Sequence, residues 1–210
     1  MVSIDYGSLK NRLTSIEING SEAFLVTKQV FTLFSGLKAR DEPTAAHSVI
    51  MAKYMHKLAR IFDPLNVNLY YLGGLIHDIG KLSMSDDILK SSSIISSKQK
   101  LHLQQHVLDG VKLLTEVGMP ALIIEIAQNH HERFNGTGYP KGLYGSEIPM
   151  SGRIAAITDT FSALTVYRRY QPVKDSLEAI EIMKDNSFLY DPDIMKCFIN
   201  LIYAEQAMTE

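Results

Sequence analysis

A single cysteine, Cys197, and the absence of tryptophan distinguish this sequence of 210 residues. One cysteine excludes the intramolecular disulfide framework of small secreted domains, and this favours the cytosol. Cys197 falls in the apolar stretch 195–202. We therefore interpret it as a buried helix residue rather than a reactive thiol.

Long hydrophobic runs and an excess of one charge are also lacking. The longest apolar run, 69–76, is far shorter than the roughly 20 residues that cross a bilayer. The N-terminus has no basic-then-apolar signal layout. Lysine and arginine number 21 against 23 aspartates and glutamates, so the basic face of nucleic acid binders is not indicated. We expect a soluble cytoplasmic protein that binds neither a membrane nor a nucleic acid polymer.

Apolar residues recur at helical spacing along most of the chain, as at Val49, Tyr54, Leu58 and Ile61. No sustained alternation of apolar and polar residues indicates a sheet. Because 46% of the residues are hydrophobic, the chain can bury one substantial core. We predict an all-α fold built as a helical bundle.

Short motifs predict where helices begin and end. Gly118-Met119-Pro120 separates two helices, Asp175 with Glu178 resembles a capping box, and Asp191-Pro192 combines an N-cap with a proline at the first helical position. Asp41-Glu42-Pro43-Thr44 has the composition of a turn. We expect the next helix to begin at His47.

Two segments differ from this pattern. Residues 1–40 lack the histidines found later, and their apolar residues indicate a short N-terminal helical extension that packs on the bundle. A dimerisation or linker segment explains residues 1–40 equally well. Residues 91–97 are rich in serine, and we expect a flexible connection whose last serines cap a helix from Lys98. The predicted division is therefore 1–40 and 41–210.

Five of the seven histidines stand in settings that indicate a shared role. Three of them belong to the pairs His77-Asp78 and His130-His131. Neighbouring helical residues point roughly 100° apart, so each pair can reach two nearby ions from one helix end. Asp159 lies among small and apolar residues, where an unpaired charge is costly and a metal would be a partner. The predicted metal ligands are His47, His77, Asp78, His106, His130, His131 and Asp159.

Charge counting favours two divalent ions at this site. Two ions bring about +4, the carboxylates of Asp78 and Asp159 supply about −2, and neutral imidazoles add nothing. The remaining charge suits a bridging hydroxide and one phosphodiester. Such an ion pair activates water and holds both the attacking and the leaving oxygen in phosphate ester hydrolysis. We expect two transition-metal ions, with Fe, Mn or Ni favoured over Zn and the identity left open.

Two motifs carry a resemblance to a known family. His77-Asp78-Ile79-Gly80-Lys81, together with HHERFNGTGYP at 130–140, resembles the HD-GYP domain. HD-GYP domains are a subgroup of the HD-superfamily metal phosphohydrolases that acts on cyclic di-GMP. The similarity runs from about Asp41 to Ile202. It implies an HD-type helical bundle, a catalytic domain over residues 41–210, and the same seven metal ligands.

The resemblance also implies roles around the metals. Lys81 would contact the bridging water or a phosphate oxygen and act in catalysis with Asp78. Tyr139 and Arg168 would line the pocket for the substrate. Gly138 would let the loop approach the substrate, because glycine lacks a side chain.

Other polar residues have weaker assignments. Glu132 and Arg153 would orient imidazole N–H groups or brace the loop. His102 lies one helical turn before His106 and competes for its role, but the family register favours His106. His56 is expected to be structural or exposed.

The chain departs from the family pattern at several positions. Some members carry a glutamate four residues before the first histidine, associated with a third metal, where this chain has Pro43. We therefore expect two ions rather than three. Gln171 replaces a common basic residue, which puts the affinity for the ligand in doubt.

Three functions fit the sequence. The first is a cyclic di-GMP phosphodiesterase in which a metal-bridged hydroxide yields pGpG and/or GMP. The second is a low-turnover cyclic di-GMP sensor or a protein-interaction module, and the third is a phosphohydrolase for another cyclic dinucleotide or nucleotide. Residues 1–40 are the expected contact for a homodimer or a signalling protein partner.

Overall fold

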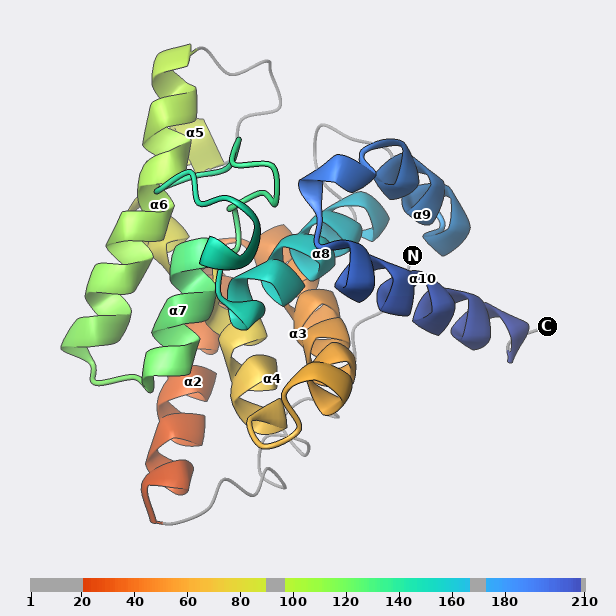
Figure 1. The fold of residues 1–210 in the computed structure, drawn as a ribbon. Coiled ribbons are helices and arrows are strands. Elements are labelled where there is room, and N and C mark those ends of the chain that lie inside the picture. Colours follow the sequence, from red (N-terminus) through yellow and green to blue (C-terminus); the bar gives the residue numbers. More distant parts are fainter. Residues whose placement is uncertain (1–20, 90–96, 167–172, 209–210) are drawn as a thin grey trace.

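Helices joined by turns and by one long loop between α7 and α8 make up the described part of the fold (Figure 1). The structure is a computed structural model, and it describes residues 21–89, 97–166 and 173–208. Within these ranges there is no strand, and an isolated bridge pairs Asn135 with Tyr144. The prediction of an all-α fold is confirmed.

The helices are numbered along the chain from α2. The α-helices are α2 (Ser21–Arg40), α3 (Glu42–Phe62), α4 (Val67–Ile76), α5 (Asp86–Leu89), α6 (Ser97–Glu116), α7 (Ala121–Asn129), α8 (Met150–Thr165), α9 (Ser176–Asp185) and α10 (Pro192–Ala207). Three short 3₁₀ helices are η1 (Ile79–Ser83), η2 (Gly145–Glu147) and η3 (Ser187–Leu189).

The start of α3 differs from the prediction. Asp41 is the N-cap, and its carboxylate accepts hydrogen bonds from the backbone N and the Oγ1 of Thr44. Proline fits the first turn of a helix, where its missing N–H is not needed. The predicted turn over Asp41–Thr44 is therefore wrong: it is a cap and a first helical turn, and His47 lies inside α3.

Other predicted boundaries hold. Gly118 lies between α6 and α7 with φ +70°, and Asp191 caps α10 by accepting from the backbone N of Asp193 and Ile194. Asp175 caps α9 by accepting from Glu178 N. The Glu178 carboxylate pairs with Lys174, so we find only the Asp175 half of the predicted capping box.

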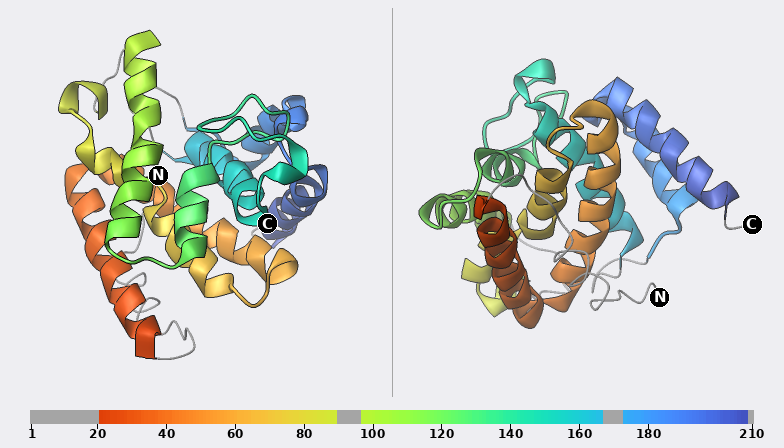
Figure 2. Two further views of the ribbon diagram at one scale, coloured as in Figure 1. Left: turned by 60° about the vertical axis from the view of Figure 1, so that its left-hand side comes forward. Right: turned by 90° about the horizontal axis from the view of Figure 1, so that it is seen from below.

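Helix α3 lies between two hydrophobic cores. Met55 and Leu58 pack with residues of α8, α9 and α10, whereas Ala45 and Ala52 pack with residues of α2, α4, α6 and α7. All views place α6 and α10 on opposite sides of the molecule (Figures 1 and 2). Polar residues that lie between the two cores are therefore surrounded by helices on several sides.

Helix α2 packs its inner face on the second of these cores. Val30, Phe34 and Leu37 are buried there, while Phe24 and Leu25 are 78% and 57% exposed. Residues 1–20 lie outside the described residues, so the division at residue 40 stays a prediction. The serine-rich connection also lies outside them, except for Ser97, where α6 begins.

Two expectations about apolar residues can be compared with the structure. Cys197 is half-buried and packs against the first core, from α10. Burial raises the pKa of its thiol, which agrees with an unreactive helix residue, but the predicted burial is only partial. None of the described helices has both the length and the apolar character that crossing a bilayer requires.

Candidate metal centre

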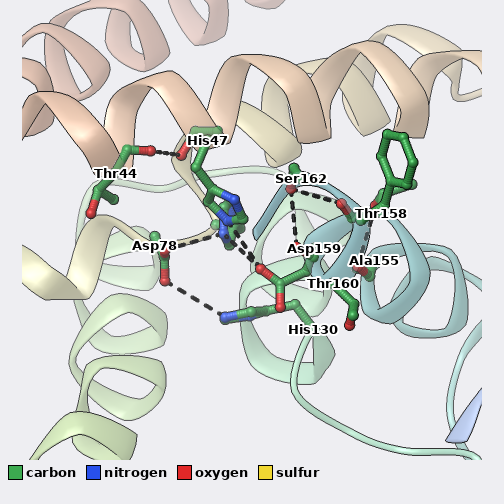
Figure 3. A network of polar contacts seen from close by, with 12 residues as sticks. Thr44, His47, Asp78, His130, Ala155, Thr158, Asp159, Thr160 and Ser162 are labelled. Atoms are coloured by element: carbon green, nitrogen blue, oxygen red, sulfur yellow. Dashed lines mark hydrogen bonds and ion pairs between the residues drawn. The ribbon is translucent and has the colours of Figure 1, made fainter. Parts of the chain in front are cut away.

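The seven predicted ligands come from five parts of the fold and meet between the two cores. His47 lies in α3, His106 in α6 and Asp159 in α8. Two dyads, His77-Asp78 and His130-His131, stand at helix ends, since His77 is the C-cap of α4 and His130 is the C-cap of α7. Figure 3 shows His47, Asp78, His130 and Asp159 pointing toward one another.

Each carboxylate contacts three imidazoles. The carboxylate of Asp78 lies 3.3 Å from His77 Nε2, 3.2 Å from His106 Nε2 and 3.7 Å from His130 Nε2. Asp159 lies 3.0 Å from His47 Nε2, 3.8 Å from His77 Nε2 and 3.5 Å from His131 Nδ1. His77 therefore contacts both carboxylates.

Two overlapping groups of ligand atoms result. The atoms of Asp78, His106, His130 and His131 lie within 4.8 Å of one another, and so do those of His47, His77 and Asp78. Asp78 belongs to both groups, as expected of a carboxylate that bridges two ions. Asp159 lies in neither group but is 3.0 Å from His47.

The backbone sets the tautomers of three imidazoles. Nδ1 of His77 lies 2.9 Å from Gly74 O, and Nδ1 of His130 lies 2.8 Å from Ala127 O. His106 Nδ1 contacts Leu103 O in the same way. A carbonyl oxygen only accepts, so each Nδ1 must carry the proton and each Nε2 keeps its lone pair.

These lone pairs face each other. Nε2 of His106 lies 3.4 Å from Nε2 of His130, and two acceptors at this distance need a positive charge between them. His77 Nε2 and Asp78 Oδ1 are buried and form no hydrogen bond with any described residue. Because a buried polar atom without a partner is unfavourable, the cluster fits a cation. The chain thus has a His/Asp cluster able to bind divalent metal.

The protonation states suit metal ligands. Burial raises the pKa of Asp78, but Lys81 and His77 outweigh it and hold the pKa well below its usual range. Burial lowers the pKa of His130 to about 3, and burial together with His130 lowers the pKa of His131 well below its ordinary value. These imidazoles are therefore neutral at neutral pH and can donate lone pairs.

The potential at His77 has the opposite sign. Burial lowers the pKa of His77, yet Asp78 and Asp159 raise it by more, and the net pKa is above its ordinary value. For Asp159, burial raises the pKa, but His47 and His131 hold it well below the usual range. Positive charge is thus stabilised between the two carboxylates.

Two predicted residues lie at the edge of the cluster. Lys81 Nζ is 2.5 Å from Asp78 Oδ2, and the ring of Tyr139 lies 4.7 Å from the ring of His131. Burial raises the pKa of Tyr139, so its hydroxyl stays protonated. The predicted substrate residue Arg168 lies outside the described residues.

Gly138 has a structural reason to be glycine. A Cβ there would lie 2.3 Å from the backbone N of Arg133 and 2.5 Å from the Cα of Glu132. The loop folds back on the end of α7, and Tyr139 N donates to His131 O at 3.2 Å. Packing of the loop accounts for Gly138, and its contact with a substrate stays a prediction.

Glu132 and Arg153 brace the structure through contacts with the loop and with the start of α10. The Glu132 carboxylate is fully buried and accepts from Lys141 N at 2.8 Å and Leu143 N at 3.0 Å. Arg153 pairs with Asp191 at 2.7 Å. These contacts support the bracing alternative, and backbone carbonyls bind Nδ1 of His77, His106 and His130.

The two remaining histidines agree with the sequence interpretation. His102 is exposed, whereas His106 is 1% exposed. His56 packs edge-on against Tyr71, with ring centroids 6.1 Å apart.

Sequence analysis missed the role of Gly80. A Cβ on Gly80 would lie 1.9 Å from His106 O and 2.5 Å from Gly110 N. Only a glycine lets η1 approach α6 this closely, and the approach brings Asp78 next to His106. The position of Gly80, two residues after the ligand Asp78, was the available signal.

Comparisons with known proteins agree with this geometry. Residues 32–194 match the family model described as HD domain. The chain is 34% identical over 170 residues to the cyclic di-GMP phosphodiesterase PA4108 of Pseudomonas aeruginosa, covering 79% of this chain and 41% of the relative. It is 38% identical over 149 residues to 3'3'-cGAMP-specific phosphodiesterase 1 of Vibrio cholerae, covering 70% and 34%.

A solved structure shows the same fold. Bd1817, described as an HDG"Y"P protein from Bdellovibrio bacteriovorus, superposes with a TM-score of 0.67 at 20% identity and covers 94% of this chain and 70% of that one. The chain spans less than half the length of the two curated relatives. With the matched family model, the two dyads and the loop of 130–140, the chain belongs to the HD domain family and, within it, to the HD-GYP group.

Proposed function

We propose that this chain is a metal-dependent phosphodiesterase that hydrolyses cyclic di-GMP to pGpG and/or GMP. The observation that carries the proposal is the sharing of Asp78 between two buried groups of imidazole nitrogens. A ligand set of this kind holds two ions side by side. The similarity to PA4108, named a cyclic di-GMP phosphodiesterase, supports the choice of substrate.

We propose two divalent transition-metal ions, with Fe, Mn or Ni favoured over Zn. The ligands would be those of the predicted set. When bound, such ions supply Lewis-acid activation of water and of the phosphodiester. The residue four positions before His47 is Pro43, which offers no ligand atom for a third ion. The ligands of the proposed ions are His47, His77, Asp78, His106, His130, His131 and Asp159.

Residues at the edge of the cluster would handle the substrate. His131 is the most exposed of the seven side chains, at 19%, so the phosphodiester would enter from its side. The ring of Tyr139 would stack on a purine, and its protonated hydroxyl can donate to a phosphate oxygen. Lys81 would place a positive charge on the phosphoryl oxygens as charge develops. Arg168 and Gly138 remain proposed contacts.

The deciding experiment incubates metal-loaded protein with cyclic di-GMP and separates the products by chromatography. We expect linear product, with turnover abolished in Asp78→Ala and unchanged in the matched control Asp185→Ala, which removes an exposed carboxylate on α9. Tight binding without product would instead establish the low-turnover sensor.

A second substrate, 3'3'-cGAMP, is favoured by one observation. A relative specific for it is 38% identical over 149 residues, a closer match than PA4108 over a shorter stretch. Equimolar competition between cyclic di-GMP and 3'3'-cGAMP discriminates the two. Faster loss of 3'3'-cGAMP would reverse our choice.

We also keep the proposal that residues 1–40 bind a second copy or a signalling protein, and that the protein acts in the cytosol. Within α2, exposed Phe24 and Leu25 support the first part. Sedimentation of the chain and of a Phe24→Ser variant tests for a dimer. A monomer at all concentrations would leave only the signalling partner.

A further inference from the structure

Arg40, the last residue of α2, contacts the segment that follows Lys81. Its Nη2 donates to Met84 O at 2.7 Å, and its Nη1 pairs with the Asp86 carboxylate. The Arg40 side chain is 31% exposed and that of Asp86 is 54% exposed. One guanidinium thus binds two acceptors across 44 to 46 residues of sequence, a geometry that suits the two Nη groups of its planar fork better than the single nitrogen of an ammonium group.

Met84 is directly connected to Lys81. Met84 N donates to Lys81 O at 3.2 Å, and Lys81 N donates to Asp78 O at 2.9 Å. The Met84 side chain is 8% exposed, so the end of η1 is also fixed by packing. Arg40 therefore binds the residue whose amide closes the turn that carries Lys81.

The opposite side of η1 is held by α6. Ser83 Oγ lies 2.6 Å from Asp109 Oδ2, and Gly80 lies against the backbone of His106 and Gly110. Segment 78–86 is thus held between α6 on one side and Arg40 on the other. Removing Arg40 would leave the segment held by α6 and by the packing of Met84.

Asp41, the residue after Arg40, supports the helix that carries His47. Asp41 caps α3, which carries His47 at its second turn. The junction of α2 and α3 therefore touches both the segment that supplies Asp78 and Lys81 and the helix that supplies His47. A displacement of this junction would therefore move both that segment and that helix.

We propose that Arg40 is a positioning residue that holds η1 so that Lys81 stays aligned with Asp78 and the phosphoryl group. The inference rests on the proposed function, because it requires Lys81 to act during turnover. Lys81 touches the reacting atoms, whereas Arg40 acts through it. A small misplacement of such a group is enough to lower the rate strongly.

A double-mutant cycle tests this inference. We expect Arg40→Ala to lower kcat about tenfold while KM changes less than about twofold, since the lost interaction acts on the transition state. In a Lys81→Ala background the same change should cost less than about twofold. The matched control Lys28→Ala removes an exposed cation of α2 and should leave kcat unchanged.

A second measurement does not depend on enzymatic activity. Hydrogen–deuterium exchange of a peptide covering 79–86 should be faster in Arg40→Ala than in the unaltered chain, and unchanged in Lys28→Ala. If Arg40→Ala fails to fold, Arg40→Lys replaces it, with an expected loss of about threefold because an ammonium keeps the charge but not the fork.

The outcomes separate the two proposals. An equal loss of kcat in both backgrounds, or unchanged exchange over 79–86, would overturn the role of Arg40. Absence of turnover in the unaltered chain would overturn the proposed function instead. Faster exchange in Arg40→Ala would then still establish that Arg40 holds η1.

Discussion

Asp78 contacts residues from both sides of the centre. It accepts from Lys81 and touches three imidazoles, while Asp159 touches three imidazoles from the other side. Both carboxylates stay ionised because these neighbours hold their pKa values well below the usual range. The residues thus supply the negative charge that a cation needs before any ion arrives.

If the proposed function is right, removal of Lys81 should separate catalysis from metal binding. We expect Lys81→Ala to lower kcat by about 100-fold, the usual effect of losing one donor to developing charge. Its metal content should stay at the level of the unaltered chain, because Lys81 is not a ligand. Steady-state kinetics and elemental analysis on the same preparation check this. Loss of metal in parallel with activity would contradict the assignment.

The sequence was informative at residues whose partners are neighbours. The dyads His77-Asp78 and His130-His131 could be recognised because adjacent side chains at a helix end point to different sides of one site. The partners of Glu132 are amides 9 and 11 residues further on, in an irregular loop. Arg153 donates a hydrogen bond to Asp191, which lies 38 residues further along the chain. No periodicity predicts such pairs.

At the scale of elements, the close approach of η1 and α6 places the two sides of the centre. We expect Gly80→Ala to destabilise the protein by more than about 3 kcal/mol, because backbone atoms would have to move away from the new Cβ. The control Gly36→Ala has no atom within 4 Å of its Cβ. That control should gain up to about 1 kcal/mol from helix propensity.

Urea unfolding followed by circular dichroism measures both glycine variants. Equal stability of Gly80→Ala and the unaltered chain would show that η1 and α6 do not need their contact.

A second junction, between α3 and α10, depends on Glu205. Its carboxylate pairs with Lys53 at 2.9 Å and with Lys57, and accepts from Tyr54 at 3.2 Å. Burial raises the pKa of Glu205, but the two lysines lower it further, so the pKa lies below its ordinary value. This contribution to stability is therefore present above the unfolded-state pKa and lost as pH falls through the folded one.

We expect Glu205→Gln to lower the free energy of unfolding at pH 7 by about 1 kcal/mol, the upper range for partly exposed pairs. The difference should shrink toward zero as pH falls through the lowered pKa of Glu205, where the carboxylate of the unaltered chain becomes protonated. Urea titrations at several pH values check this, with Glu116→Gln as an exposed control on α6. A difference independent of pH would contradict the ion-pair explanation.

Element boundaries show where sequence patterns are ambiguous. Asp41-Glu42-Pro43 fits both a turn and a helix start, because aspartate and proline favour both. The structure resolves it as the start of α3, since the Asp41 carboxylate finds the amide of Thr44. Asp191-Pro192 has the same chemistry and was recognised as a helix start because a long apolar stretch follows it.

At the scale of the whole molecule, we expect metal binding at the centre to raise the free energy of unfolding. The predicted ligands lie in α3, α6 and α8 and at the C-terminal ends of α4 and α7, so no short segment can assemble them. We expect EDTA to lower the melting temperature and added Mn²⁺ to restore it. Binding of an ion at 100 times its Kd adds about 2.7 kcal/mol to the free energy of unfolding. Thermal scans check this. The same shift in Asp78→Asn would place the stabilising ion elsewhere.

The hydrogen bond from Phe134 N to Leu189 O joins the loop after the second dyad to a segment more than fifty residues later. On a ribosome, which releases the chain from its N-terminus, His130 and His131 emerge long before Leu189 and Asp191 are made. The loop then lacks its last support. Loading of the proposed ions should therefore follow the synthesis of residue 189, and a nascent chain stalled before that residue should not retain them.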